Sequence, residues 1–253
     1  MEMRKWIHDE LMLTFNLYCR LSYSQYNSRN QKVIELAELI GRTPGAIAMK
    51  LCNFASLDPV HQSRGIKGLA NVSVADKLIW EEFNSNWEKA VTESNELLAD
   101  LTKDIVEEPA VLNIPTGPTD VERTIHQRRG QSFFRQAVLA AYGMKCCVTG
   151  TPIPQMLVAS HILPWSGFPE ERLNPRNGIC LSAIHDAAFD RGLMTLDENY
   201  RIILSDTIRK SANTVQLLQI AFLSYEGKVI AMPDRFLPDQ NFLQVHRESI
   251  FSP

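Results

Sequence analysis

Two prolines and a glycine fall close together near the middle of this 253-residue chain, in the segment Asn113-Ile-Pro-Thr-Gly-Pro-Thr-Asp120. Proline lacks the backbone N–H that a helix interior or a central strand uses, and glycine favours turns, so no regular element is expected to continue through this segment. The length suits one large or two modest domains. We therefore predict an α+β protein with a helical domain over residues 1–105, a linker over 106–120 and a second domain over 121–253.

The first domain is predicted to be all-helical. Apolar residues recur at spacings of four, four and three, at Ile7, Leu11, Phe15 and Tyr18, which places them on one helix face. Residues 11–17 also alternate as in a strand, but the length of the segment and its few β-branched residues favour a helix. A further helix is predicted over residues 74–98.

Residues 33–51 have the layout of a helix-turn-helix. Ala37 is small where two helices would cross, Gly41 suits a positive φ in the turn, and Thr43 can cap the second helix. A second helix that enters the major groove would present four side chains to DNA, namely Arg42, Thr43, Lys50 and Asn53. The alternative is an αα-hairpin that only packs within the domain.

Charge is distributed unevenly along the chain, although the net charge is only −3. Residues 92–122 hold one basic and eight acidic side chains, whereas residues 123–191 hold eight basic and four acidic ones. A polyanion such as DNA would be attracted to the second of these segments. The sequence has neither an apolar run long enough for a membrane span nor an apolar N-terminal segment typical of a signal peptide, so we expect a cytoplasmic protein that does not bind membranes.

The second domain is predicted to mix helices with short strands. A helix is expected over residues 123–142, then a hairpin formed by residues 146–148 and 156–162, then a helix over 179–189. After these, short strands are expected over residues 193–196, 201–204 and 228–232, followed by a helix over 242–251.

Three sequence motifs in this domain resemble those of the HNH endonucleases. They are Ala159-Ser-His-Ile-Leu-Pro-Trp165, then Asn174-Pro-Arg-Asn-Gly-Ile-Cys-Leu181, then His185-Asp-Ala-Ala-Phe-Asp-Arg-Gly192. The resemblance implies a ββα-metal fold, in which a histidine ends one strand, an asparagine lies in the following loop and metal ligands lie on the helix. It covers residues 144–196 closely, and the preceding Arg129-Gly-Gln131 and Cys147-Val-Thr-Gly150 resemble bacterial restriction-type members.

The resemblance assigns two catalytic residues. His161 would be the base that deprotonates water, since an imidazole with a pKa near 6.5 is largely neutral at cellular pH. Asn177, sixteen residues later, would close the loop and orient His161.

The metal ligands are expected on the helix. Asp186 and Asp190 stand nine and thirteen residues after Asn177 and share a helix face at i and i+4. His185 is a further candidate, as a ligand, as a residue that supports a ligand, or as a contact to phosphate. Oxygen ligands with open water positions suit Mg²⁺ or Mn²⁺. Ser160 departs from the family pattern, because many members have an Asp or His before the base.

Arginines near these motifs are candidate phosphate contacts, because guanidinium groups bind phosphate through paired hydrogen bonds. The candidates are Arg128, Arg129, Arg135 and Arg176.

The sequence therefore predicts a metal-dependent endonuclease of double-stranded DNA. The resemblance implies restriction of foreign DNA, with dependence on base modification left open, and cleavage of both strands would call for a homodimer or two successive events. A DNA-binding regulator with an inactive nuclease-like domain stays open as an alternative, as does a nuclease whose substrate is RNA or single-stranded DNA.

Overall fold

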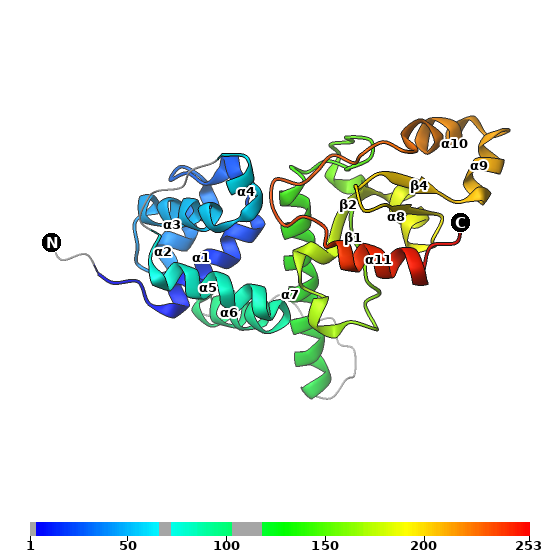
Figure 1. The fold of residues 1–253 in the computed structure, drawn as a ribbon. Coiled ribbons are helices and arrows are strands. Elements are labelled where there is room, and N and C mark those ends of the chain that lie inside the picture. Colours follow the sequence, from blue (N-terminus) through cyan, green and yellow to red (C-terminus); the bar gives the residue numbers. More distant parts are fainter. Residues whose placement is uncertain (1–3, 66–71, 103–117) are drawn as a thin grey trace. The chain divides into compact units, whose positions relative to one another are not determined.

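The computed structural model describes residues 4–65, 72–102 and 118–253, with side chains omitted for residues 118–126. The chain forms two compact units, residues 1–136 and 137–253, which divide inside a long helix, α7 (Pro118–Ala141) (Figure 1). This helix covers the one predicted over residues 123–142 except for its last residue. Most of the predicted 106–120 linker lies outside the described residues, so the linker stays a prediction.

The described part of unit 1 is helical, as the sequence predicts. Before α7 its helices are α1 (His8–Arg20), α2 (Gln31–Leu39), α3 (Pro44–Leu57), α4 (Pro59–Ser63), α5 (Val74–Ser85) and α6 (Trp87–Thr102), with a short 3-10 helix at Tyr23–Gln25. Among the described residues, no helix is both long and apolar enough to cross a membrane.

Helix α1 is the centre of unit 1. It contacts α2, α3, α5 and α6, and every residue from Glu10 to Cys19 is buried. Phe15 packs its ring against those of Phe54 on α3 and Phe83 on α5, with centroids 5.0 and 4.3 Å apart. Because the helix is covered on all sides, its apolar residues follow no single face, which explains the strand-like alternation over residues 11–17.

The helices and turn of the predicted helix-turn-helix segment are present as α2 and α3. Gly41 adopts φ +66° in the turn, a conformation that costs glycine little. Thr43 caps α3 by accepting a hydrogen bond from the Ala46 N–H (3.2 Å), and Pro44 occupies the first helical position. These features account for where the second helix begins.

The single helix predicted over residues 74–98 is two helices. The chain leaves the helical conformation at Asn86, whose φ is −157°. The Asn86 side chain accepts a hydrogen bond from the Lys89 N–H (2.9 Å) and so caps α6. Asparagine competes with helical backbone bonding in this way, which is why it ends one helix and starts the next.

Unit 2 contains a strand pair followed by a helix. Its elements after α7 are β1 (Leu157–His161), β2 (Gly178–Ser182), α8 (Ala183–Asp190), β3 (Met194–Leu196), β4 (Ile202–Leu204), α9 (Asp206–Ala212), α10 (Gln216–Ala221) and α11 (Gln240–Ser249). Short 3-10 helices lie at Pro154–Met156, Pro169–Glu171, Pro175–Asn177 and Leu223–Tyr225. Strands β1 and β2 pair antiparallel, β3 pairs with β4, and α8 packs against β1 and β2.

The predicted hairpin was wrong in its first strand, whereas its second strand, predicted over residues 156–162, is present as β1. Residues 146–148 form a turn that closes when Gly150 N–H donates to the Cys146 carbonyl (2.8 Å). The partner of β1 is β2, in the first half of the segment predicted to be a helix over residues 179–189. Every residue of β2 is buried, and a short apolar run buried on both faces has no period to distinguish it from a helix.

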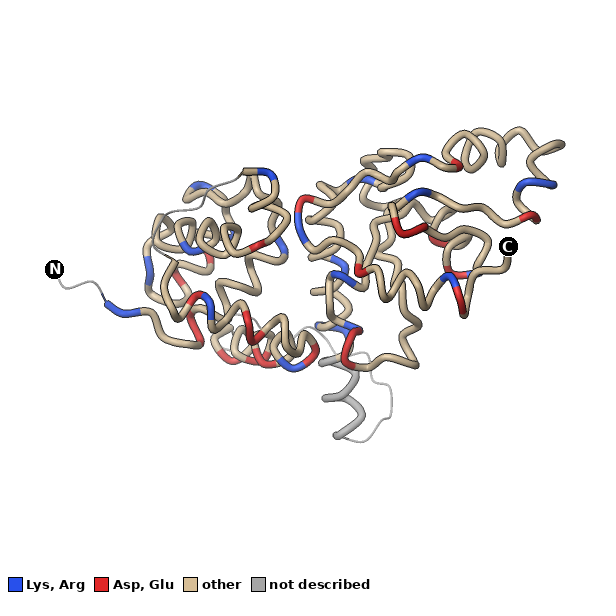
Figure 2. Tube along the Cα trace, viewed as in Figure 1, with Lys and Arg blue, Asp and Glu red and all other residues tan. Residues whose placement is uncertain are grey.

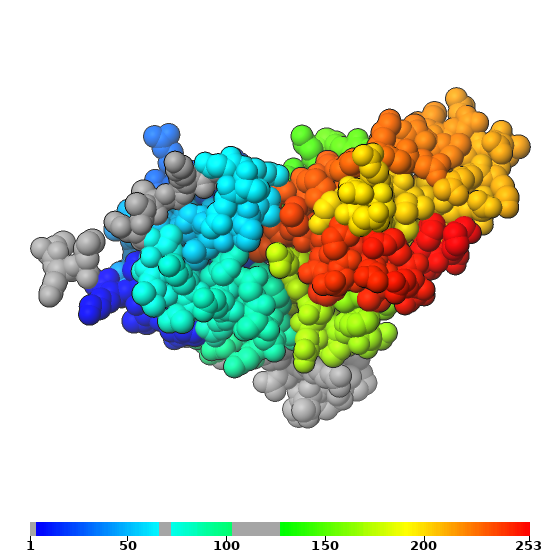
Figure 3. Space-filling model, in the orientation of Figure 1, coloured from blue at the N-terminus to red at the C-terminus, as the bar shows by residue number. Residues whose placement is uncertain are grey.

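The C-terminal helix α11 packs on β3, and in Figure 3 its residues (red) lie beside the yellow surface near residues 190–200. At the end of α8, Gly192 has φ +68°, and a Cβ there would collide with the Ile250 carbonyl. Ser252 N–H donates to the Gly192 carbonyl (2.9 Å). The close approach of the two backbones requires glycine at position 192.

His246 on α11 connects three elements. Its ring stacks on Phe189 of α8 with centroids 3.8 Å apart, Nε2 donates to the Phe189 carbonyl (3.2 Å), and Nδ1 accepts from Thr195 Oγ1 on β3 (2.9 Å). Because the residue is only 1% exposed, its imidazole is part of the core and does not reach solvent or a bound phosphate.

We expect His246 to make folding sensitive to acid. Burial lowers the pKa of His246 to about 4, and the charge of Arg247 acts in the same direction. An unfolded chain, with a histidine pKa near 6.5, therefore binds more protons between pH 6.5 and 4, and stability falls as pH falls through that window, by about 3 kcal/mol between pH 7 and pH 4. Urea unfolding at a series of pH values would measure this slope. His246→Gln should flatten it, and an equal slope in the variant would contradict the assignment.

Candidate active site

His161 is the last residue of β1 and pairs with Gly178 of β2. Its Nε2 lies 2.9 Å from the carbonyl oxygen of Arg172. A carbonyl only accepts hydrogen bonds, so Nε2 carries the proton of the neutral ring and the lone pair is on Nδ1. Burial lowers the pKa of His161, against the opposing effects of the Arg172 carbonyl and the Asp186 charge. The imidazole is thus kept in its neutral form, which can accept a proton.

Asn177 closes the loop between β1 and β2. Its Oδ1 accepts from the Leu163 N–H (2.8 Å), and its Nδ2 donates to the Glu171 carbonyl (3.0 Å). The side chain is buried and bonded at both ends, so it holds the start of the loop to the segment that carries the Arg172 carbonyl. An effect of Asn177 on His161 would therefore have to pass through the loop backbone. Sequence patterns carry no signal for the Arg172 carbonyl, because it is a main-chain group.

Asp186 and Asp190 lie one turn apart on α8, which packs against β1. Desolvation raises the pKa of Asp190, and so does the neighbouring charge of Asp186, while a long hydrogen bond from Ser160 Oγ (3.5 Å) opposes them. The Asp186 charge also acts on His161. The two carboxylates and the imidazole therefore lie close enough to interact electrostatically, and none of the three is fully buried.

These carboxylates fit a divalent cation. The charge of Asp186 raises the pKa of Asp190, and a cation bound by both carboxylates would offset this repulsion. Oxygen donors suit Mg²⁺ or Mn²⁺. Within residues 4–65, 72–102 and 118–253, no group of three or more His, Cys, Asp or Glu residues is arranged to hold a metal. Water and substrate oxygens would have to supply the remaining ligands.

His185 differs from the expectation that it could bind a metal or phosphate. It is 1% exposed, its Nε2 donates to the Ala221 carbonyl (2.7 Å), and its Nδ1 accepts from Ser182 Oγ (2.7 Å). Both ring nitrogens are engaged inside the unit, and the ring packs on Phe222. His185 thus joins α8 to the end of α10 and to Phe222, and it is not available as a ligand.

Residues 146–197 match the family model of the HNH endonucleases. No curated protein matches the chain. The matched segment contains β1, β2, α8 and β3, and with them His161, Asn177, Asp186 and Asp190. These residues are therefore similar to an HNH endonuclease domain, which supports a nuclease type of activity.

The arginines predicted to bind phosphate differ in their surroundings. Arg128, Arg129 and Arg135 are exposed on α7, in the part of the helix that belongs to unit 1, whereas the HNH segment lies in unit 2. Arg176 lies in the loop that Asn177 closes and is partly exposed. Arg172, in the same loop, donates from Nε to the Trp165 carbonyl (2.7 Å) and stacks on the Trp165 ring. Of the predicted arginines, Arg176 is therefore the one that lies in the loop between β1, which ends at His161, and β2.

Three of the four predicted DNA contacts in unit 1 point into the domain, so that prediction needs correction. Arg42 Nη2 pairs with buried Glu10 (2.6 Å), and its guanidinium stacks on Trp6. Lys50 Nζ pairs with Asp76 (2.6 Å), and Asn53 Nδ2 donates to the same carboxylate (3.2 Å). Thr43 is exposed, and its hydroxyl caps α3. The carboxylate of Asp76 is buried, and Lys50 and Asn53 compensate its charge and satisfy its oxygens. The sequence does not indicate this pairing, because Asp76 is 26 residues from Lys50.

We expect Lys50→Met to destabilise unit 1 by about 3 kcal/mol, because breaking a buried ion pair leaves the other charge without compensation. Urea unfolding followed by tryptophan fluorescence would measure the change. Met49→Gln is the matched control, since Met49 is the neighbouring residue and is 56% exposed. If Lys50→Met left stability unchanged but weakened DNA binding, the original DNA-contact prediction would be reinstated.

Acidic residues (red in Figure 2) recur along α5 and α6 of unit 1. Helix α6 carries Glu88, Glu93, Glu96 and Asp100. Negative charge of this kind repels a phosphate backbone. These two helices are therefore poor candidates for a DNA-binding face.

Proposed function

We propose that the protein is a metal-dependent DNA endonuclease that hydrolyses phosphodiester bonds and restricts foreign DNA. The observation that supports this most strongly is the grouping of His161, Asp186 and Asp190 within the segment that matches the HNH endonucleases. The HNH match favours a nuclease over a regulator with an inactive nuclease-like domain.

In the proposed reaction, Nδ1 of His161 takes a proton from a water molecule, whose oxygen attacks phosphorus in line with the departing 3′ oxygen. The Arg172 carbonyl keeps the proton on Nε2 and orients the ring, and Asn177 donates to the carbonyl of the preceding residue, Glu171, which fixes that stretch of the loop. Asp186 and Asp190 would hold a divalent cation, which when bound would supply charge stabilisation for the phosphoryl oxygens and the departing oxygen. The bond that breaks is P–O3′, so the products carry a 5′ phosphate and a 3′ hydroxyl.

The experiment is incubation of the purified chain with plasmid in Mg²⁺, Mn²⁺ or EDTA. Parallel reactions would use methylated, unmethylated and single-stranded DNA, and RNA. We expect nicking or linearisation of duplex DNA that EDTA abolishes, with product ends that ligate without phosphorylation. Cleavage of RNA or single strands alone would change the substrate class, and no cleavage of any substrate would overturn the proposal in favour of a DNA-binding regulator.

One site of this kind cuts one strand. Linear product that accumulates directly from supercoiled plasmid would indicate two copies acting together, whereas nicked circles that precede linear product would indicate successive events.

A further inference from the structure

Unit 1 contains a cavity of about 600 Å³ that is separate from the HNH segment. Its apolar wall is formed by five leucines, Leu13, Leu17, Leu36, Leu39 and Leu98, from α1, α2 and α6. Small-molecule sites in proteins typically have volumes of about 300–1,000 Å³ and mostly apolar walls with a few polar groups. The cavity has the size and lining of such a site.

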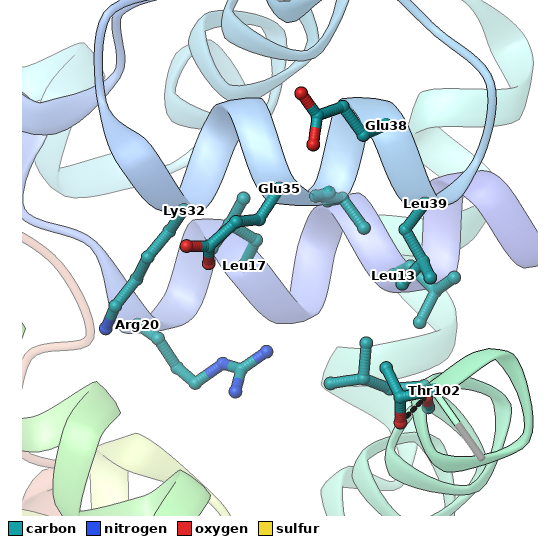
Figure 4. A pocket seen from close by; sticks show the side chains of 10 residues that line it. Leu13, Leu17, Arg20, Lys32, Glu35, Glu38, Leu39 and Thr102 are labelled. Atoms are coloured by element: carbon teal, nitrogen blue, oxygen red, sulfur yellow. Dashed lines mark hydrogen bonds between the residues drawn. The ribbon is translucent and has the colours of Figure 1, made fainter. Parts of the chain in front are cut away.

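Arg20, the last residue of α1, contributes a positive charge to this cavity. Figure 4 shows its guanidinium directed into the open space beneath α2. Nε donates a long hydrogen bond to the Asn16 carbonyl (3.3 Å), and burial lowers the pKa of Arg20. Within the part of the chain that the structure describes, no carboxylate lies at ion-pair distance from it.

The remaining charged residues of the cavity are at its edge. Lys32, Glu35 and Glu38 on α2 are exposed, so water and salt screen their one positive and two negative charges. The guanidinium of Arg20 is more buried and less screened. A partly desolvated guanidinium is stabilised by an anion that accepts its N–H groups in pairs.

We propose that this cavity binds an amphipathic anion, with an apolar chain against the leucines and one carboxylate or phosphate group on Arg20. The proposal concerns unit 1 alone and does not depend on nuclease activity. Neither the HNH match nor the catalytic candidates include any of the residues involved.

The test is isothermal titration of the full chain with laurate and with dodecyl phosphate below their micelle concentrations, with dodecanol as the neutral analogue. We expect saturable 1:1 binding of both anions, and binding of dodecanol at least about tenfold weaker, because hydrogen bonds to a charged group contribute about 1.5–3 kcal/mol. Arg20→Gln can keep the bond to Asn16 and should weaken both anions about tenfold without changing dodecanol. Arg29→Gln, an exposed arginine outside the cavity, is the matched control.

Leu39→Trp provides a second test that does not remove the charge. Leu39 is only partly buried, so the indole ring of the introduced tryptophan should fill the cavity and abolish binding of all three probes. The far-ultraviolet circular dichroism should stay unchanged. The proposal is overturned if neither anion binds saturably, if dodecanol binds as tightly as laurate, or if folded Arg20→Gln or Leu39→Trp binds the anions like the unaltered chain.

Discussion

Replacing His161 with alanine should slow phosphodiester cleavage about 10³-fold while leaving DNA binding within a factor of two. A positioned general base contributes about 10²–10⁴-fold, and the lone pair on Nδ1 has no substitute in alanine. Single-turnover cleavage at saturating protein would measure the chemical step, and a filter-binding or fluorescence assay in EDTA would measure affinity. Added imidazole should restore part of the rate to His161→Ala, since the Arg172 carbonyl that orients the ring is main chain and is retained.

His8→Ala is the matched control for this variant. His8 is an exposed histidine of unit 1 whose ring bonds to Asp9 and Glu82, and its loss should leave cleavage unchanged. Equal rates for His161→Ala and the unaltered chain would show that another group deprotonates water.

The second large effect is expected at the two carboxylates of α8. Asp186→Asn and Asp190→Asn should each lower the cleavage rate about 10²-fold, which corresponds to about 3 kcal/mol of lost charge stabilisation, and should raise the Mg²⁺ or Mn²⁺ concentration that gives half the maximal rate. Amides match the shape of the carboxylates but carry no charge, so folding should be preserved. Removal of metal by EDTA should abolish activity of the unaltered chain.

Calorimetric titration of the DNA-free protein with Mn²⁺ separates metal binding from catalysis, and the double variant should show no heat of binding. Glu198→Gln is the matched control, because Glu198 is an exposed carboxylate of the same unit. Full activity of both single variants at the same metal concentration would exclude these residues as ligands.

The sequence predicts the site better than the surrounding fold, for a physical reason. Spacing is enough to place Asp186 and Asp190 on one face of a helix, because helix geometry is local. The resemblance to the HNH motifs implies His161 at a strand end and Asn177 in the next loop, and the structure has them there. Spacing does not reveal that His185 and His246 are buried, because their partners, the Ala221 and Phe189 carbonyls, are main-chain groups more than 30 residues away.

In unit 1, too, the features set by neighbouring residues could be predicted from the sequence, whereas those set by distant residues could not. Gly41, Thr43 and Pro44 mark the turn and the start of α3 by local backbone preferences, and the structure confirms these helix boundaries. The roles of Lys50 and Arg42 depend on Asp76 and Glu10, which are distant in sequence. A polar side chain on a helix can face solvent, DNA or a buried carboxylate with the same periodicity, so composition alone cannot separate these roles.

The packing of α11 on α8 sets a lower limit on the length of any expression fragment that contains the HNH segment. A fragment trimmed to residues 146–197 would lose the ring that stacks on Phe189 and the backbone that meets Gly192. It would also expose the apolar side of α8 to water, and we expect it to aggregate rather than to yield a minimal enzyme. Engineers who transplant this domain should carry the chain through Ser252.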